Sequence, residues 1–209
     1  MIPRISICLV IIAVLCAQEN IDVSAYKIKA DRAFADAKGD PQLLSVAAGY
    51  YMDAREYKIA EDIYTHILEK YNPHNPYVYS NLSVFCGKQK KYDLAIRYAD
   101  LALDIDPHHM HAKAVKASWL YEKGEKERGL QLFESIPMPQ EADQLDLYYG
   151  CRACFYASVG DADRVKESVK LIKSDGFATF FKNDIVFDKF RNESWYLDMV
   201  KELPIGNSQ

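Results

Sequence analysis

The chain has 209 residues, of which 49% are hydrophobic and 27% are charged, a composition typical of one folded, soluble unit rather than a disordered tail. A formal net charge of −4 argues against nucleic-acid binding, because that function uses clustered Lys and Arg to neutralise phosphates. Three of the five cysteines lie beyond residue 17, and an odd number excludes a complete disulfide framework.

Residues 1–17 are predicted to be a secretory signal peptide. Arg4 gives a weakly basic start, and an almost unbroken apolar run then extends from Ile5 to Ala17 before the chain turns polar. This run is too short to span a bilayer comfortably. We therefore expect cleavage after Ala17 and a secreted or periplasmic protein without further membrane contact. Two alternatives remain open: an uncleaved N-terminal membrane anchor, and lipid attachment at Cys16.

Residues 18–40 are predicted to form an N-terminal capping helix. Ala30, Phe34 and Ala37 make one apolar stripe at helical spacing, and Asp40-Pro41 ends the segment. No matching first helix precedes this stripe. A lone helix of this kind suits the open end of a stack of helix pairs, which needs a cap.

From residue 41 to residue 175 the chain repeats itself. Ala60, Ala95, Gly129 and Val165 occupy equivalent places in four successive segments, with spacings of 35, 34 and 36 residues. Recurrence at about 34 residues is typical of helix–turn–helix solenoids, in which one unit buries its apolar face only by stacking on its neighbours. The predicted units are 41–75, 76–109, 110–142 and 143–175.

The unit 76–109 shows the pattern most clearly. Leu82, Ser83 and Cys86 lie on one helical stripe, and a second stripe that includes Ala95 follows a polar turn. Asp106-Pro107 ends the second helix, because proline clashes with continued helix and pushes the residue before it out of the α region. Ser83 and Ala95 are expected where the two helices approach most closely.

This unit resembles the tetratricopeptide repeat (TPR). The matching positions are Asn81-Leu82, Gln89, Tyr92-Asp93, Ala95-Ile96, Tyr98, Ala102-Leu103 and Asp106-Pro107. The resemblance implies an all-α, right-handed TPR-type solenoid of about four helix–turn–helix repeats with helical caps at both ends. It weakens in the last two units, where Lys116 and Arg152 replace the usual leucine of the first helix and Pro137-Met138-Pro139 precedes the fourth unit.

Residues 176–209 are predicted to form a C-terminal helical cap and a short polar tail. Asp184 and Ser194 are candidate N-caps of two short helices, and aromatic residues follow each of them. Trp195 and Tyr196 also offer a route to self-association, so a solenoid that only binds itself remains a possibility.

The resemblance implies that the first helix of each repeat lines a concave face, on which TPR proteins hold a partner protein or peptide. The partner-binding residues expected there are Val46, Met52, Tyr77, Asn81, Val84, Lys88, His111, Val115, Ser118, Glu122, Cys151 and Cys154. Mostly small and uncharged side chains suit an apolar helix or an extended segment, but they equally suit packing between neighbouring first helices. The clamp with which TPR domains capture acidic chaperone tails is reduced to Asn81, so we exclude that role.

We therefore predict a non-catalytic interaction scaffold or adaptor, with no cofactor and no catalytic residues. The chain has no nucleophile motif and no glycine-rich phosphate loop. The alternative is a metal- or thiol-dependent protein that uses the cluster His108, His109 and His111, or the pair Cys151 and Cys154. That cysteine pair lies well inside a predicted helix, which favours packing over redox chemistry.

Overall fold

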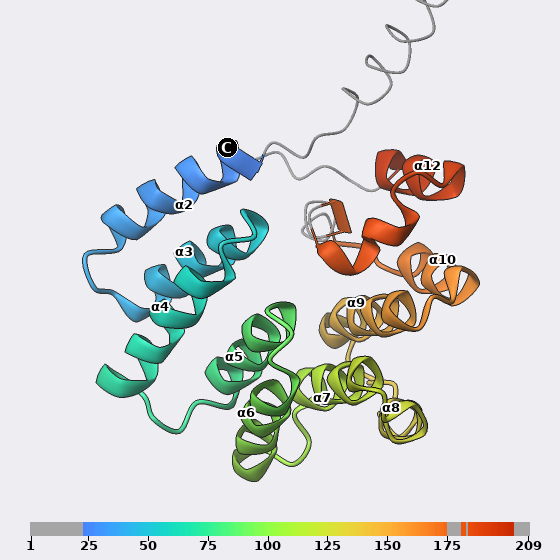
Figure 1. The fold of residues 1–209 in the computed structure, drawn as a ribbon, viewed down its shortest axis with the longest axis horizontal. Helices are drawn as coiled ribbons and strands as arrows, with labels where there is room; N and C mark the ends of the chain where they lie inside the picture. Colours follow the sequence, from blue (N-terminus) through green and yellow to red (C-terminus); the bar gives the residue numbers. More distant parts are fainter. Residues whose placement is uncertain (1–22, 175–180, 183, 203–209) are drawn as a thin grey trace, which may run out of the picture.

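The computed structural model describes residues 23–174, 181–182 and 184–202. These residues form an all-α solenoid of repeated helix pairs, as predicted (Figure 1). The helices are α2 (Val23–Ala37), α3 (Pro41–Asp53), α4 (Tyr57–Lys70), α5 (Pro76–Lys88), α6 (Tyr92–Ile105), α7 (Met110–Lys123), α8 (Lys126–Glu134), α9 (Ala142–Val159), α10 (Ala162–Lys170), the 3₁₀ helix η1 (Ile185–Phe190) and α12 (Ser194–Glu202).

The helices pack as pairs, α3 with α4, α5 with α6, α7 with α8 and α9 with α10. The first helices of successive pairs also meet, since α5 contacts α7 and α7 contacts α9. In Figure 1 the first helices α5, α7 and α9 follow the inner side of the curve, and their partners α6, α8 and α10 follow the outer side. The inner side is the concave face of the solenoid.

Local sequence signals explain where these helices begin. Asp40 and Asn75 cap α3 and α5, and the side chain of each accepts hydrogen bonds from two backbone N–H groups of the first turn. A proline follows each cap at a position where the missing N–H costs nothing. The sequence therefore places these two helix starts without help from tertiary contacts.

Small residues set the distance between the paired helices. Ser83 and Ala95 are fully buried where α5 meets α6, as the sequence predicts. Gly129 of α8 lies so close to α7 that an added Cβ would stand 2.7 Å from the carbonyl oxygen of Ala117. A larger side chain at these positions would push the helices apart.

The turn between the helices of each pair has one residue in the left-handed conformation. This residue is Arg55 (φ 60°) in the first pair, Lys90 (φ 61°) in the second, Gly124 (φ 106°) in the third and Gly160 (φ 89°) in the fourth. Glycine adopts this conformation without the Cβ penalty that Arg55 and Lys90 carry. The first two turns are therefore strained where the last two are not.

The two residues that depart from the TPR pattern form ion pairs along the stack. Lys116 of α7 pairs with Asp100 of α6 at 2.5 Å, and Arg152 of α9 pairs with Glu167 of α10 at 2.8 Å. The guanidinium of Arg152 also lies over the ring of Tyr156. Long basic side chains thus pair with neighbouring helices at positions where TPR proteins usually have leucine.

The C-terminal elements pack against the last pair of helices. Asp184 caps η1 by accepting a hydrogen bond from the backbone N–H of Val186 at 2.8 Å, and α12 begins at Ser194. Phe187, Phe190 and Tyr196 are buried in the same hydrophobic cluster as the core of α9 and α10. Tyr196 donates its hydroxyl proton to the carbonyl oxygen of Phe181. These aromatic side chains pack inside the cap.

Candidate partner-binding face

The residues predicted to bind a partner come from the first helix of each pair and differ in exposure. Val46 and Tyr77 are the most open apolar members, with 51% and 66% of their surface exposed, and Glu122 is also exposed. The remaining members are half-buried: Met52, Asn81, Val84, Lys88, His111, Val115, Ser118, Cys151 and Cys154. Within the predicted set, exposed apolar surface therefore lies chiefly at α3 and at the start of α5.

Some members of this set already bind a neighbouring helix. The Asn81 amide donates to the hydroxyl of Tyr64 at 3.1 Å, and the His111 ring hydrogen-bonds the hydroxyl of Ser80 at 3.2 Å. Ser80 is fully buried. Both contacts run to a helix of the preceding pair, and partner binding by Asn81 and His111 stays a prediction.

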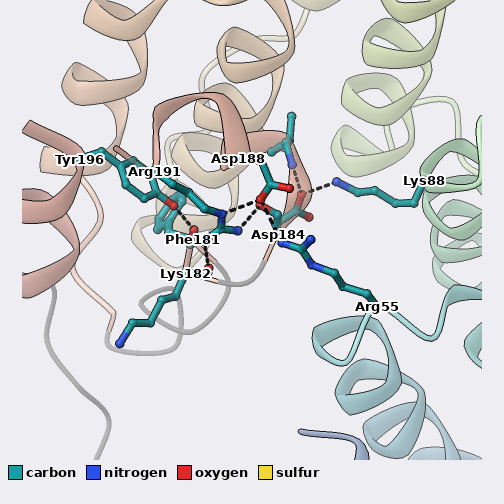
Figure 2. A network of polar contacts seen from close by, with 9 residues as sticks. Arg55, Lys88, Phe181, Lys182, Asp184, Asp188, Arg191 and Tyr196 are labelled. Atoms are coloured by element: carbon teal, nitrogen blue, oxygen red, sulfur yellow. Dashed lines mark hydrogen bonds and ion pairs between the residues drawn. The ribbon is translucent and has the colours of Figure 1, made fainter. Parts of the chain in front are cut away.

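Lys88 has a partner that sequence reasoning did not find. Its ammonium forms a buried ion pair with Asp184 of the C-terminal cap, and the two side chains are 9% and 7% exposed (Figure 2). Arg55 donates to Asp188 at 2.9 Å, and Arg191 donates to the same carboxylate at 2.5 Å. We call the ion pairs of Arg55 and Lys88 with Asp188 and Asp184 the tail clamp.

The tail clamp joins three distant parts of the chain. Arg55 lies in the turn between α3 and α4, Lys88 is the last residue of α5, and the two aspartates flank or belong to η1. The paired residues are 133 and 96 positions apart in sequence. The cap therefore packs on α9 and is joined by ion pairs to the turn after α3 and to the end of α5.

The charge of Asp184 influences other buried groups near the tail clamp. Burial, together with the carboxylate of Asp184, raises the pKa of Asp53 to about 6. The same two causes raise the pKa of Tyr57 and of the Cys154 thiol well above their usual ranges. A carboxylate destabilises further negative charge nearby, so this part of the face favours cations and neutral groups.

The cysteine pair of α9 lacks the features of a reactive thiol site. Burial raises the pKa of Cys151 to about 12, and burial is also the main cause of the raised pKa of Cys154. Both thiols stay protonated near neutral pH, whereas nucleophilic cysteines need a lowered pKa. The packing interpretation of this pair fits these environments.

The histidine cluster is engaged in local structure. His109 caps α7 by accepting the N–H of Ala112 at 3.1 Å, while His108 is exposed. Burial lowers the pKa of His109 and lowers that of His111 to about 4, so both rings are neutral near pH 7. In the part of the chain that the structure describes, no group of three or more His, Cys, Asp or Glu side chains is arranged to hold a metal.

The predicted leader, residues 1–17, lies outside the described residues. Among the helices that are described, none has the length and hydropathy needed to cross a bilayer. The expectations of cleavage and export are therefore proposals.

Comparison with known proteins gives limited similarity to a TPR protein. No protein-family model matches the chain. The chain is 26% identical over 118 residues to the small glutamine-rich tetratricopeptide repeat-containing protein 2 of Saccharomyces cerevisiae. The match covers 56% of this chain and 32% of the yeast protein, so the chain spans about a third of that relative's length. This similarity to a TPR-containing protein agrees with the repeated helix pairs of the structure.

Proposed function

We propose that the chain is a non-catalytic interaction scaffold that holds a protein or peptide partner on its concave face. The observations that support the proposal are the stack of repeated helix pairs and the exposure of Val46 and Tyr77, two of the residues that the sequence predicts on the inner face. Similarity to a TPR-containing protein supports a role in protein interaction. Apolar side chains presented by a rigid row of helices suit an apolar helix or an extended segment.

The test compares one substitution on each side of the solenoid. Val46→Glu changes an exposed residue of α3 that the sequence predicts on the inner face, and Leu101→Glu changes an apolar residue of α6, an outer helix, that is 42% exposed. Crosslinking in the native compartment, followed by mass spectrometry, identifies the bound partner. We expect V46E to lose it and L101E to retain it, with equal helicity by circular dichroism. If both variants retain the partner equally, the partner does not bind the inner face at α3.

We also propose that residues 1–17 direct export and are then removed, giving a secreted or periplasmic protein. N-terminal sequencing of the protein isolated from its native compartment is expected to start at Gln18. A protein that keeps Met1 and sediments with membranes would instead support the uncleaved-anchor alternative.

A further inference from the structure

The sequence holds the acceptor motif for N-linked glycans at two places. The motif is Asn-X-Ser or Asn-X-Thr, in which X is any residue except proline. It occurs as Asn81-Leu82-Ser83 and as Asn192-Glu193-Ser194. A glycan is bulky and hydrophilic, so its asparagine has to lie at the surface of the folded protein. The places of the two motifs in the fold therefore decide which of them can carry a glycan.

The first motif lies inside the helix stack. Asn81 is in the middle of α5, and its side-chain nitrogen, the atom that would carry the sugar, donates to the hydroxyl of Tyr64 at 3.1 Å. Ser83 is fully buried, and its hydroxyl accepts the indole N–H of Trp119 at 3.2 Å. A transferase can reach this serine only if α5 separates from its neighbours. A sugar on Asn81 would also displace Tyr64, so the fold closes the first motif.

The second motif lies in an exposed turn. This turn joins η1 to α12, and Asn192, Glu193 and Ser194 are all exposed. With the other described residues, the side-chain amide of Asn192 forms no hydrogen bond. Ser194 is the first residue of α12, and helix ends open more readily than helix interiors. Both side chains that a transferase must reach are thus accessible while the cap stays folded.

Buried aromatic residues on both sides hold this turn at the surface. Phe190 precedes the motif and Tyr196 follows it, and they are 7% and 3% exposed. The backbone N–H of Glu193 donates to the carbonyl oxygen of Phe190 at 2.9 Å. The backbone of the turn is therefore anchored in the core of the cap, while the side chain of Asn192 faces solvent. A glycan at Asn192 adds bulk outside the apolar cluster and leaves the packing of the cap unchanged.

We propose that Asn192 is a site of N-linked glycosylation and that the folded chain carries no glycan at Asn81. The inference rests on the proposed export, because this modification belongs to secreted proteins. The co-substrate is an oligosaccharide joined to a polyisoprenyl diphosphate. The Nδ2 atom of Asn192 forms a bond to the anomeric carbon of the first sugar, and the bond from that carbon to the diphosphate oxygen breaks. The departing oxygen keeps the electron pair, and Nδ2 releases one proton.

The test expresses the full chain in cultured eukaryotic cells that glycosylate their secreted proteins, and maps the product. Peptide N-glycosidase in heavy-oxygen water converts each glycosylated asparagine to a labelled aspartate, which mass spectrometry places in the sequence. Asn192→Gln and Ser194→Ala each destroy the second motif, and Asn81→Gln destroys the first. Ser194→Thr is the matched control, because it changes the same residue and keeps the motif.

We expect the label at Asn192 and not at Asn81, together with a shift in gel mobility that the glycosidase removes. The shift should be lost in N192Q and S194A and kept in S194T and N81Q. An unmodified Asn192 in the secreted chain, or a glycan on Asn81 of that chain, would overturn the proposal. A mobility shift that persists in N192Q would overturn it as well.

A second arm separates this inference from the proposed export. In it, an established secretory leader replaces residues 1–17, so the chain enters the secretory route independently of its own N-terminus. Secretion with this leader but not with the native one would reject export by residues 1–17. The acceptor site is then read from the leader-swapped chain, taken from the medium or from the secretory compartments of the cells. A glycan on its Asn192 supports the inference, and an unmodified Asn192 rejects it.

Discussion

Arg55 and Lys90 provide a matched pair that measures what the tail clamp contributes to stability. Both residues stand at the equivalent turn position with nearly the same backbone, φ 60° and φ 61°, and later turns use glycine there. Lys90 is exposed, while Arg55 is half-buried and donates to Asp188. Substituting each by glycine changes the backbone strain alike, so the difference between the variants isolates the side-chain contacts of Arg55.

The magnitude follows from two effects. A left-handed non-glycine residue costs about 1–2 kcal/mol, and glycine at a fixed position costs about 0.5–1 kcal/mol in unfolded-chain entropy, so Lys90→Gly should stabilise by about 0.5–1 kcal/mol. Arg55→Gly makes the same backbone gain but loses a partly exposed ion pair, worth about 1 kcal/mol, and some packing of its buried stem. We expect Arg55→Gly to be less stable than Lys90→Gly by about 1–2 kcal/mol.

Urea denaturation followed by far-UV circular dichroism measures this difference, and thermal melting should separate the two midpoints by about 2–8 °C. Arg191 still pairs with Asp188 in the Arg55→Gly variant, so the cap is expected to remain folded. Two equal gains in stability would show that Arg55 does not hold the cap. Destabilisation by Lys90→Gly would refute the argument from backbone strain.

Three further predictions follow from buried positions. Gly87→Ala should lower the free energy of unfolding, measured in urea, by about 1–3 kcal/mol, because the added Cβ would lie 2.2 Å from the Trp119 ring. Gly49→Ala should raise it by up to about 1 kcal/mol, because nothing lies within 4 Å of its added Cβ. Equal effects of the two substitutions would contradict this reasoning. The native pKa of Asp53, about 6, exceeds its unfolded value near 3.8, so its ionisation removes stability as the pH rises between these values. Asp53→Asn should therefore raise the melting temperature over wild type at pH 7.5 but not at pH 3.5, and a gain of the same size at both pH values would sink the idea. Added zinc should leave the melting temperature unchanged, because His109 and His111 already hydrogen-bond within the fold; a rise of several degrees would revive the metal alternative.

The cap illustrates where sequence reasoning reached its limit. Asp184 was predicted as an N-cap, and its carboxylate does accept the N–H of Val186. The same oxygen also receives Lys88, which no local pattern indicates. One signal was available in the sequence. The later repeats have Gly124 and Gly160 at the left-handed turn position, so Arg55 at the equivalent position indicates that its side chain makes a contact that offsets the backbone strain.

The sequence by itself determined the helix pairs, their capped starts and the all-α solenoid, because hydrophobic periodicity and capping act between residues a few positions apart. Only the tertiary structure decided that the C-terminal cap reaches back to Lys88 and Arg55, across 96 and 133 residues. The reason is physical. Any lysine can pair with any aspartate, and the curvature of the whole stack selects the two that meet.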